Sequence, residues 1–176
     1  MSNLYLKFPT LEDKCNVWDY RQEFLSNGEM HISGSGNIED FGSYEEWLRK
    51  VEKEVDIETC GEGRVPCTQY LTYRYGDNKL VGMLQIRHDL NDYLLQFGGH
   101  IGDSVRPSER NKGFATEQIA LALKKCKSLK IKNVLITCKK SNKASARTII
   151  KNNGVFENEL PYEEEFMQRY WIELEK

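Results

Sequence analysis

The chain has 176 residues, of which 39% are hydrophobic and 30% are charged, and its formal net charge is −2. This length suits one domain with a single core, and the composition is that of a folded protein. The near-neutral charge gives no indication of a nucleic-acid partner, and no apolar run approaches the roughly 20 residues that a membrane helix needs. We therefore expect a single domain over residues 1–176 that binds neither nucleic acid nor membrane.

The first residues and the cysteines indicate the cellular compartment. The N-terminus lacks the charged and apolar regions of a signal peptide, which predicts a cytoplasmic protein. The five cysteines are odd in number and irregular in spacing, which fits neither a disulfide framework nor a zinc knuckle. We expect reduced, mostly buried thiols and no metal site.

The first half of the chain predicts two helices followed by a three-stranded antiparallel meander. After a short alternating segment at 5–8, Thr10 caps a helix from Leu11 to about Leu25. Ser43 opens a second helix, whose apolar face contains Trp47, Leu48, Val51 and Val55. Alternating patterns then predict strands at 67–75, 80–87 and 94–105.

The segment between the two helices, residues 29–41, is rich in glycine and serine and has the most flexible composition in the chain. One interpretation is an ordinary linker. The other is a mobile wall over an acceptor site, because His31, Glu39 and Asp40 cluster there and loops often carry recognition. The pattern leaves both interpretations open.

The second half of the chain alternates helices and strands. Ile119, Ala122 and Cys126 mark the buried face of a long helix. The apolar run 134–138 predicts a buried strand, parallel to the strand before the helix because a helical crossover joins them. A helix capped by Ser141 or Asn142 and ended by Asn152-Asn153-Gly154 follows, and strands at 155–160 and 166–174 complete the chain.

Residues 105–116 carry the most specific motif, R-x-x-G-x-A, which Arg110, Gly113 and Ala115 form between a strand and a helix. Small residues there allow backbone N–H groups to approach a ligand, and the positive end of the helix dipole points at the same place. The chain has neither the G-x-x-x-x-G-K-[ST] of a P-loop nor the G-x-G-x-x-G of a dinucleotide-binding fold. The motif therefore predicts a phosphate-binding loop of another kind.

This motif in this position resembles the acyl-CoA pyrophosphate motif of the GNAT superfamily of N-acetyltransferases, and the order of the predicted elements is similar to the GNAT fold over nearly the whole chain. The resemblance implies an α/β (α+β) fold with a mixed, mostly antiparallel central sheet of about seven strands. It also implies helices on both faces and two parallel strands that splay apart at the cofactor cleft. The acyl donor would be acetyl-CoA, and the residues implied to bind it are Val105, Arg110, Asn111, Lys112, Gly113, Phe114, Ala115, Thr116, Asn142 and Ser145.

The reaction that the resemblance implies is direct transfer of an acetyl group to a primary amine of a small molecule or peptide. The amine must lose a proton before it attacks, and His100 and Asp103 are the candidate bases. Strand alternation places these two side chains on opposite faces unless a bulge intervenes, and Gly98-Gly99-His100 is equally consistent with a bulge whose imidazole is only hydrogen-bonded.

The group that protonates the departing thiolate is a second open question. Many family members place a tyrosine seven residues after the asparagine that Asn142 matches, but this chain has Ile149 there. The role of acid is then open to solvent or to a residue from another strand, such as Tyr170. A covalent route through Cys138 is disfavoured, because a buried cysteine is inert unless its pKa is lowered.

Two other classes of function compete with the enzyme. One is a catalytically silent acyl-CoA-binding module that senses the cofactor or assembles with a partner. The other is a Mg²⁺-dependent nucleotide enzyme, which is disfavoured because only Asp103 and Glu109 lie near the motif.

Exposed strands near the C-terminus suggest a homodimer. The sequence does not identify the acceptor amine, although a cationic substrate would suit four acidic residues, Glu39, Asp40, Asp89 and Asp92.

Overall fold

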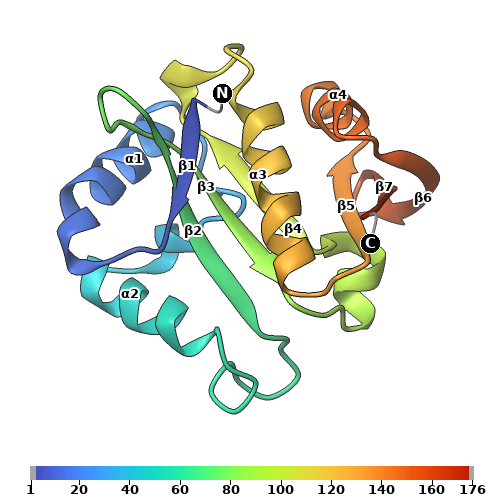
Figure 1. Cartoon of the computed structure of the whole chain (residues 1–176), viewed down its shortest axis with the longest axis horizontal. Coiled ribbons are helices and arrows are strands. Elements are labelled where there is room, and N and C mark those ends of the chain that lie inside the picture. The colour runs from blue at the N-terminus through green and yellow to red at the C-terminus, as the bar shows by residue number, and fades with distance from the viewer. Residues whose placement is uncertain (1–2, 175–176) are drawn as a thin grey trace.

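The computed structural model describes residues 3–174 and forms a mixed α/β fold with mostly antiparallel strands, as predicted (Figure 1). The ends of the predicted domain, residues 1–2 and 175–176, lie outside the described residues, and the single domain stays a prediction. The elements are, in chain order, β1 (Leu4–Lys7), α1 (Lys14–Ser26), α2 (Tyr44–Lys53), β2 (Cys67–Arg74), β3 (Leu80–Arg87), β4 (Ile101–Val105), α3 (Phe114–Ser128), β5 (Asn133–Lys139), α4 (Lys143–Lys151), β6 (Val155–Tyr162) and β7 (Glu165–Glu173).

The strands are divided between two sheets instead of forming the one central sheet expected. A four-stranded sheet has the order β1-β2-β3-β4, and a three-stranded sheet has the order β5-β7-β6. β4 and β5 run in the same direction, lie side by side at their beginnings and separate toward their ends (Figure 1). The splayed parallel pair that the family resemblance implies is therefore present at the junction of the two sheets.

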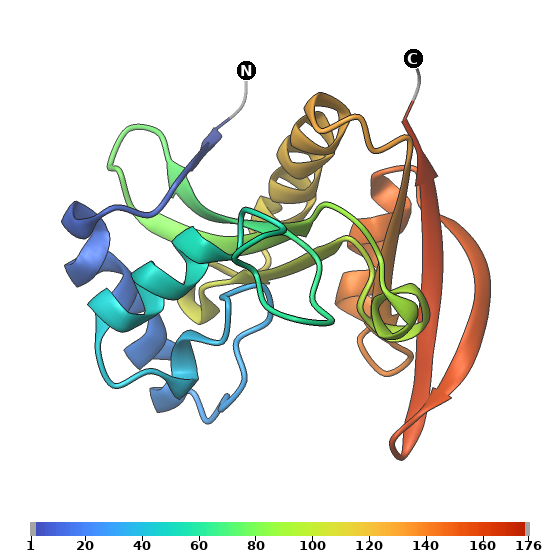
Figure 2. The same ribbon diagram turned by 90° about the horizontal axis from the view of Figure 1, so that it is seen from below.

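Helices cover both faces of the four-stranded sheet (Figure 2). On one face, α1 and α2 bury Tyr20, Phe24 and Trp47 against β2 and β3. On the other face, α3 buries Ile119 and Ala122 in a second cluster that continues into β5 and β7. The sheet is thus held between two separate cores, and the predicted buried face of α3 is confirmed. Trp47, Leu48 and Val51 of α2 are buried as predicted, but Val55 lies beyond the end of this helix and is exposed.

The segment before β4 differs from the predicted strand at 94–105. Residues Leu94–Gly98 form a π-helical turn, and only Ile101–Val105 pairs with β3. The Asn91 side chain starts this turn by accepting from the Leu94 N–H at 2.9 Å. Gly99 follows with φ 65°, at a point where a Cβ atom would lie 2.6 Å from the Leu135 carbonyl oxygen. The apolar run therefore brings the chain into the junction of the sheets and does not extend β4.

The glycine- and serine-rich segment 29–41 is packed tightly against the protein. Ile32 and Ser35 have no exposed surface, and the Trp47 indole donates to the Ser35 carbonyl at 2.8 Å. Gly34 has φ 69°, and a Cβ atom there would overlap the Gly102 carbonyl of β4. Glycine and serine at these positions allow two backbones to approach closely, so the composition indicates close packing and not the expected flexibility.

The remaining expectations concern membranes and cysteines. Within residues 3–174, no helix has the length and apolar character needed to cross a lipid bilayer. Cys60, Cys67, Cys126 and Cys138 are buried and Cys15 is exposed, all as free thiols.

Candidate functional site

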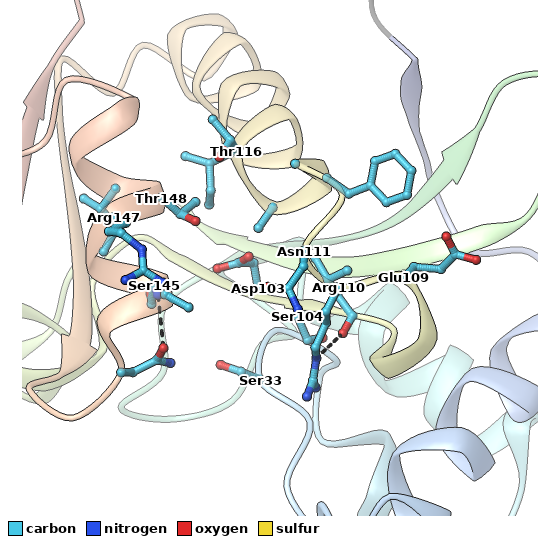
Figure 3. Close-up of a pocket in the computed structure, with 18 of the residues that line it drawn as sticks. Ser33, Asp103, Ser104, Glu109, Arg110, Asn111, Thr116, Ser145, Arg147 and Thr148 are labelled. Carbon is cyan, nitrogen blue, oxygen red and sulfur yellow. Dashed lines mark hydrogen bonds between the residues drawn. The ribbon is translucent and has the colours of Figure 1, made fainter.

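A cavity of about 550 Å³ opens between the end of β4, the first turn of α3 and one face of α4. This volume lies within the range of small-molecule sites, roughly 300 to 1,000 Å³. Figure 3 shows the Asp103 carboxylate in the middle of the cavity, with Thr148 of α4 on one side and Arg110 on the other. Ser33 approaches from the 29–41 segment, which forms the remaining wall.

The residues implied to bind the cofactor line this cavity, with one exception. Lys112 points away, because its ammonium donates to the Glu109 carboxylate at 2.8 Å and to the Ser108 carbonyl at 3.1 Å. The residues that do line the cavity are Val105, Arg110, Asn111, Gly113, Phe114, Ala115, Thr116, Asn142 and Ser145. The motif and the start of α4, distant in sequence, therefore face one space.

The first turn of α3 offers backbone donors to this cavity. Gly113 is the N-cap residue with φ 84°, and Asn111 also has a left-handed φ of 62°. Within residues 3–174, the amides of Phe114, Ala115 and Thr116 have no hydrogen-bond acceptor. Unpaired amides at a helix N-terminus favour an anion, because their N–H groups and the helix dipole point the same way. These donors fit the diphosphate of a CoA molecule.

Arg110 ties the motif to the wall opposite. Its guanidinium donates to both carboxylate oxygens of Glu29, at 2.7 and 2.8 Å, and to the Val105 carbonyl at 3.2 Å. The guanidinium also lies 5.3 Å from the centre of the Phe24 ring. The Arg110 hydrogen bonds lower the pKa of Glu29, so this pair stays ionised and holds the 29–41 segment beside the motif.

Glu109 is buried directly beside the motif and is surrounded by cations. Its carboxylate accepts from Arg74, Lys79 and Lys112 at 2.7 to 2.8 Å. Burial raises the pKa of Glu109, but these three hydrogen bonds outweigh burial and hold the pKa at about 2. Within the described part of the chain, no group of three or more His, Cys, Asp or Glu residues is arranged to hold a metal ion. A carboxylate engaged by three cations does not suit the Mg²⁺ site of a nucleotide enzyme.

Asp103 is the predicted catalytic residue that faces the cavity. Its carboxylate accepts from the Gln118 amide nitrogen at 3.4 Å. Burial raises the pKa of Asp103 to about 6, while the Gln118 hydrogen bond acts in the opposite direction. A carboxyl group with this pKa is ionised at neutral pH and is basic enough to accept a proton.

His100 lies outside the cavity, at the junction between the two sheets. The Leu135 N–H donates to Nδ1 of His100 at 2.9 Å, and the imidazole is buried. Burial lowers the pKa of His100 to about 4, so the ring is neutral near pH 7. A position outside the cavity does not favour the predicted role of His100 as general base. It agrees with the other interpretation of the sequence, in which the imidazole is only hydrogen-bonded.

A family model described as an acetyltransferase (GNAT) domain matches residues 4–155. The chain belongs to the GNAT family of acetyltransferases. It is accordingly an enzyme of the N-acetyltransferase class, and GNAT acetyltransferases use acetyl-CoA. A comparison with curated protein sequences found no significant match.

Solved structures show that the GNAT fold extends over nearly the whole chain. A ribosomal-protein-S5-alanine acetyltransferase from Vibrio fischeri is 12% identical, with 98% of this chain and 94% of that chain covered and a TM-score of 0.73. RimJ from Mycobacterium smegmatis, in complex with CoA-disulfide, is 17% identical, with 97% and 81% covered and a TM-score of 0.71. A mutant of the spermidine N-acetyltransferase SpeG from Vibrio cholerae is 17% identical, with 98% and 95% covered and a TM-score of 0.66.

The other predicted catalytic groups lie away from the cavity of this GNAT protein. Tyr170 is buried, and its hydroxyl donates to the Gln168 side chain at 2.9 Å. Burial raises the pKa of the Cys138 thiol, which does not line the cavity. Ile149 does line it, at the position where many family members have a tyrosine. Because Tyr170 lies away from the cavity, its position does not favour a role as the acid that protonates the thiolate. Cys138 lies away from the cavity as well, which does not favour a role as nucleophile.

Several polar residues at the cavity were not identified from the sequence. Thr148 and Arg147 of α4 line it, and Thr148 lies one turn after Ser145 on the same helical face. That three-residue spacing is the signal that could have identified Thr148. His31 lines the opposite wall, and its Nδ1 lies 2.7 Å from Glu39. The sequence itself indicates His31 together with Glu39, and the two form a hydrogen-bonded pair at this wall of the cavity.

Proposed function

We propose that this GNAT protein transfers the acetyl group of acetyl-CoA directly to a primary amine of a small molecule or peptide. The observation that carries the proposal is the placement of two features in one cavity. The unpaired amides of Phe114 to Thr116 lie at one end of it, and the partly buried carboxylate of Asp103 lies in its middle. Bound acetyl-CoA would supply the activated acetyl group.

The donor half of the cavity would use main chain for most of its contacts. The amides at the start of α3 would bind the diphosphate. Within residues 3–174, β4 pairs with a strand along one edge only, so its other edge could align an extended pantetheine arm. The Val105 carbonyl at this edge accepts from Arg110 in the structure. Asn142 accepts from the Ser145 N–H at 3.0 Å as the cap of α4, which fixes its amide at the cavity wall.

Asp103 would act as the general base. An ammonium group that enters the cavity would give a proton to the Asp103 carboxylate, leaving the nitrogen lone pair free to attack. The walls hold the amine beside the acetyl group, and this proximity supplies much of the rate acceleration. A pKa of about 6 predicts that the rate rises with pH through that value, since only the ionised carboxylate accepts the proton.

The acceptor would enter past the 29–41 segment. His31 and Ser33 line this side of the cavity, and Glu29 is already paired with Arg110. The names of the similar structures include a protein alanine and a polyamine as acceptors, which supports a primary amine without deciding between a peptide and a small molecule. A homodimer and a cytoplasmic location stay predictions.

The experiment is an assay of free CoA release from acetyl-CoA in the presence of primary amines. The panel contains a polyamine and two peptides, one with N-terminal alanine and one with N-terminal serine. Asp103→Asn is expected to lower kcat/KM for the preferred amine about 100- to 10,000-fold and to leave CoA affinity unchanged. Tight CoA binding with no release on any amine would instead support the silent acyl-CoA-binding module.

A further inference from the structure

Gln118 is a fully buried residue of α3 whose side chain reaches the four-stranded sheet. Its amide nitrogen lies 3.3 Å from the Met83 carbonyl, 3.3 Å from the Ser104 carbonyl and 3.4 Å from the Asp103 carboxylate. The side chain therefore connects α3, β3 and β4 directly behind the carboxylate that faces the cavity.

The orientation of the Gln118 amide follows from its neighbours. The three groups around its nitrogen are all acceptors, so an amide oxygen in that place would meet three oxygens and no donor. The amide oxygen points instead toward Gly82, where it has no hydrogen-bond donor among the described residues. A Cβ atom on Gly82 would overlap this oxygen.

We propose that Gln118 is a positioning residue, which fixes the Asp103 carboxylate toward the cavity from a recess that Gly82 opens in β3. The inference rests on the proposed role of Asp103 as general base. The hydrogen bond from Gln118 is the one that the Asp103 carboxylate accepts within residues 3–174. Such a donor favours one orientation of a partly buried carboxylate and stabilises its ionised form.

Other ionisable groups near Asp103 do not take over this role. Burial raises the pKa of Tyr20 of α1, so this residue stays neutral, and its hydroxyl donates to the Ser104 side chain at 3.1 Å and not to Asp103. Leu84 of β3 is the register partner of Asp103 and is apolar. Within residues 3–174, none of the other charged or titratable side chains that line the cavity forms a hydrogen bond or ion pair with Asp103, and they are Glu29, His31, Glu109, Arg110, Arg147 and Lys151.

The consequence is a defined effect on the pH dependence of the reaction. A donor bonded to the carboxylate stabilises the ionised form of Asp103, so its removal raises the Asp103 pKa further. In a plot of kcat/KM against pH, the limb that rises with ionisation of Asp103 then moves to higher pH. A residue that only filled space between α3 and the sheet would change stability and leave this limb in place.

Two variants remove the contact in different ways. Gln118→Met keeps the length of the side chain and removes the donor, whereas Gly82→Ala keeps both Gln118 and Asp103 and displaces the amide. Each is expected to move the rising limb upward by about one pH unit, since a hydrogen bond to a charged group is worth about that much. Gln22→Met, at an exposed position of α1, is the matched control and should leave the limb unchanged.

A second readout separates this inference from the proposed function. Carbon-13 NMR titration of the carboxyl groups follows the Asp103 pKa without catalysis, and Asp103→Asn assigns its signal. If Asp103→Asn keeps full activity, the role as general base fails, and the titration still tests Gln118. A wild-type Asp103 midpoint in the folded Gln118→Met or Gly82→Ala protein would overturn the inference.

Discussion

The backbone N–H of Leu135 donates to Nδ1 of His100 at 2.9 Å, and the N–H of His100 donates to the Leu135 carbonyl at 2.7 Å. This reciprocal pair joins the four-stranded sheet to the three-stranded sheet. Beyond it, β4 and β5 separate to leave the edge that faces the cavity (Figure 1). His100, directly before β4, and Leu135 of β5 therefore set the point at which the two strands begin to separate.

The contact between His100 and Leu135 predicts that His100 contributes a hydrogen-bond acceptor to the fold and takes no part in proton transfer. His100→Asn places an amide oxygen close to the position of Nδ1 and should retain both fold and acetyl transfer. His100→Leu leaves the buried Leu135 N–H unpaired, which is expected to cost about 1 to 3 kcal/mol in the free energy of unfolding. Urea denaturation and the CoA-release assay measure the two effects. Equal loss of activity in both folded variants would restore His100 as the base.

The pH dependence of stability gives a separate test of the same residue. The folded-state pKa of His100 is about 4, below the value of about 6.5 in an unfolded chain. Its contribution is therefore fully present above pH 6.5 and is lost as pH falls toward 4, by at most about 3 kcal/mol. The unfolding free energy of wild type should fall relative to that of His100→Asn as the pH is lowered through this window. A constant difference from pH 7.5 to pH 4 would show that His100 is not buried as a neutral ring.

The elements of this fold were largely predictable because their signals are local. The capping box at Ser43 and the spacing of Trp47, Leu48 and Val51 identify α2. The R-x-x-G-x-A motif likewise placed Gly113 correctly at the start of α3. Such features depend on neighbours within one or two turns, which the sequence displays directly.

The parts that were not predictable depend on partners distant in the sequence. Nothing near His100 indicates that its ring meets Leu135, 35 residues later. The composition of 29–41 suggested flexibility because the sequence does not show that Gly34 packs on Gly102. The recess at Gly82 is visible only once α3 lies across the sheet and brings Gln118 to it.

The close packing of the 29–41 segment predicts an effect on the acceptor side of the cavity. Gly34→Ala would overlap the Gly102 carbonyl and displace the wall that carries His31 and Ser33. We expect KM for the amine to rise about tenfold or more while CoA affinity measured by calorimetry stays the same. Gly28→Ala is the matched control, because Gly28 also has a left-handed φ, of 79°, but an added Cβ meets nothing within 4 Å. Equal changes in both variants would attribute the effect to backbone strain and not to the wall.

Gly113 provides the most direct test of the phosphate-binding loop. With φ 84° and no atom within 4 Å of an added Cβ, the position favours glycine for its backbone conformation and leaves the space above it for a ligand. Gly113→Ala is expected to cost about 1 to 2 kcal/mol of stability, and Gly113→Asn less, because asparagine tolerates the left-handed region. Although Gly113→Asn should be the more stable variant, it should bind CoA more weakly than Gly113→Ala, since the larger asparagine side chain occupies more of the diphosphate site. Calorimetry should show weaker CoA binding for both variants, with the greater loss for Gly113→Asn, and unchanged binding of pantetheine, which has no diphosphate. CoA binding that matches wild type in both folded variants would contradict a role for this loop in holding the diphosphate.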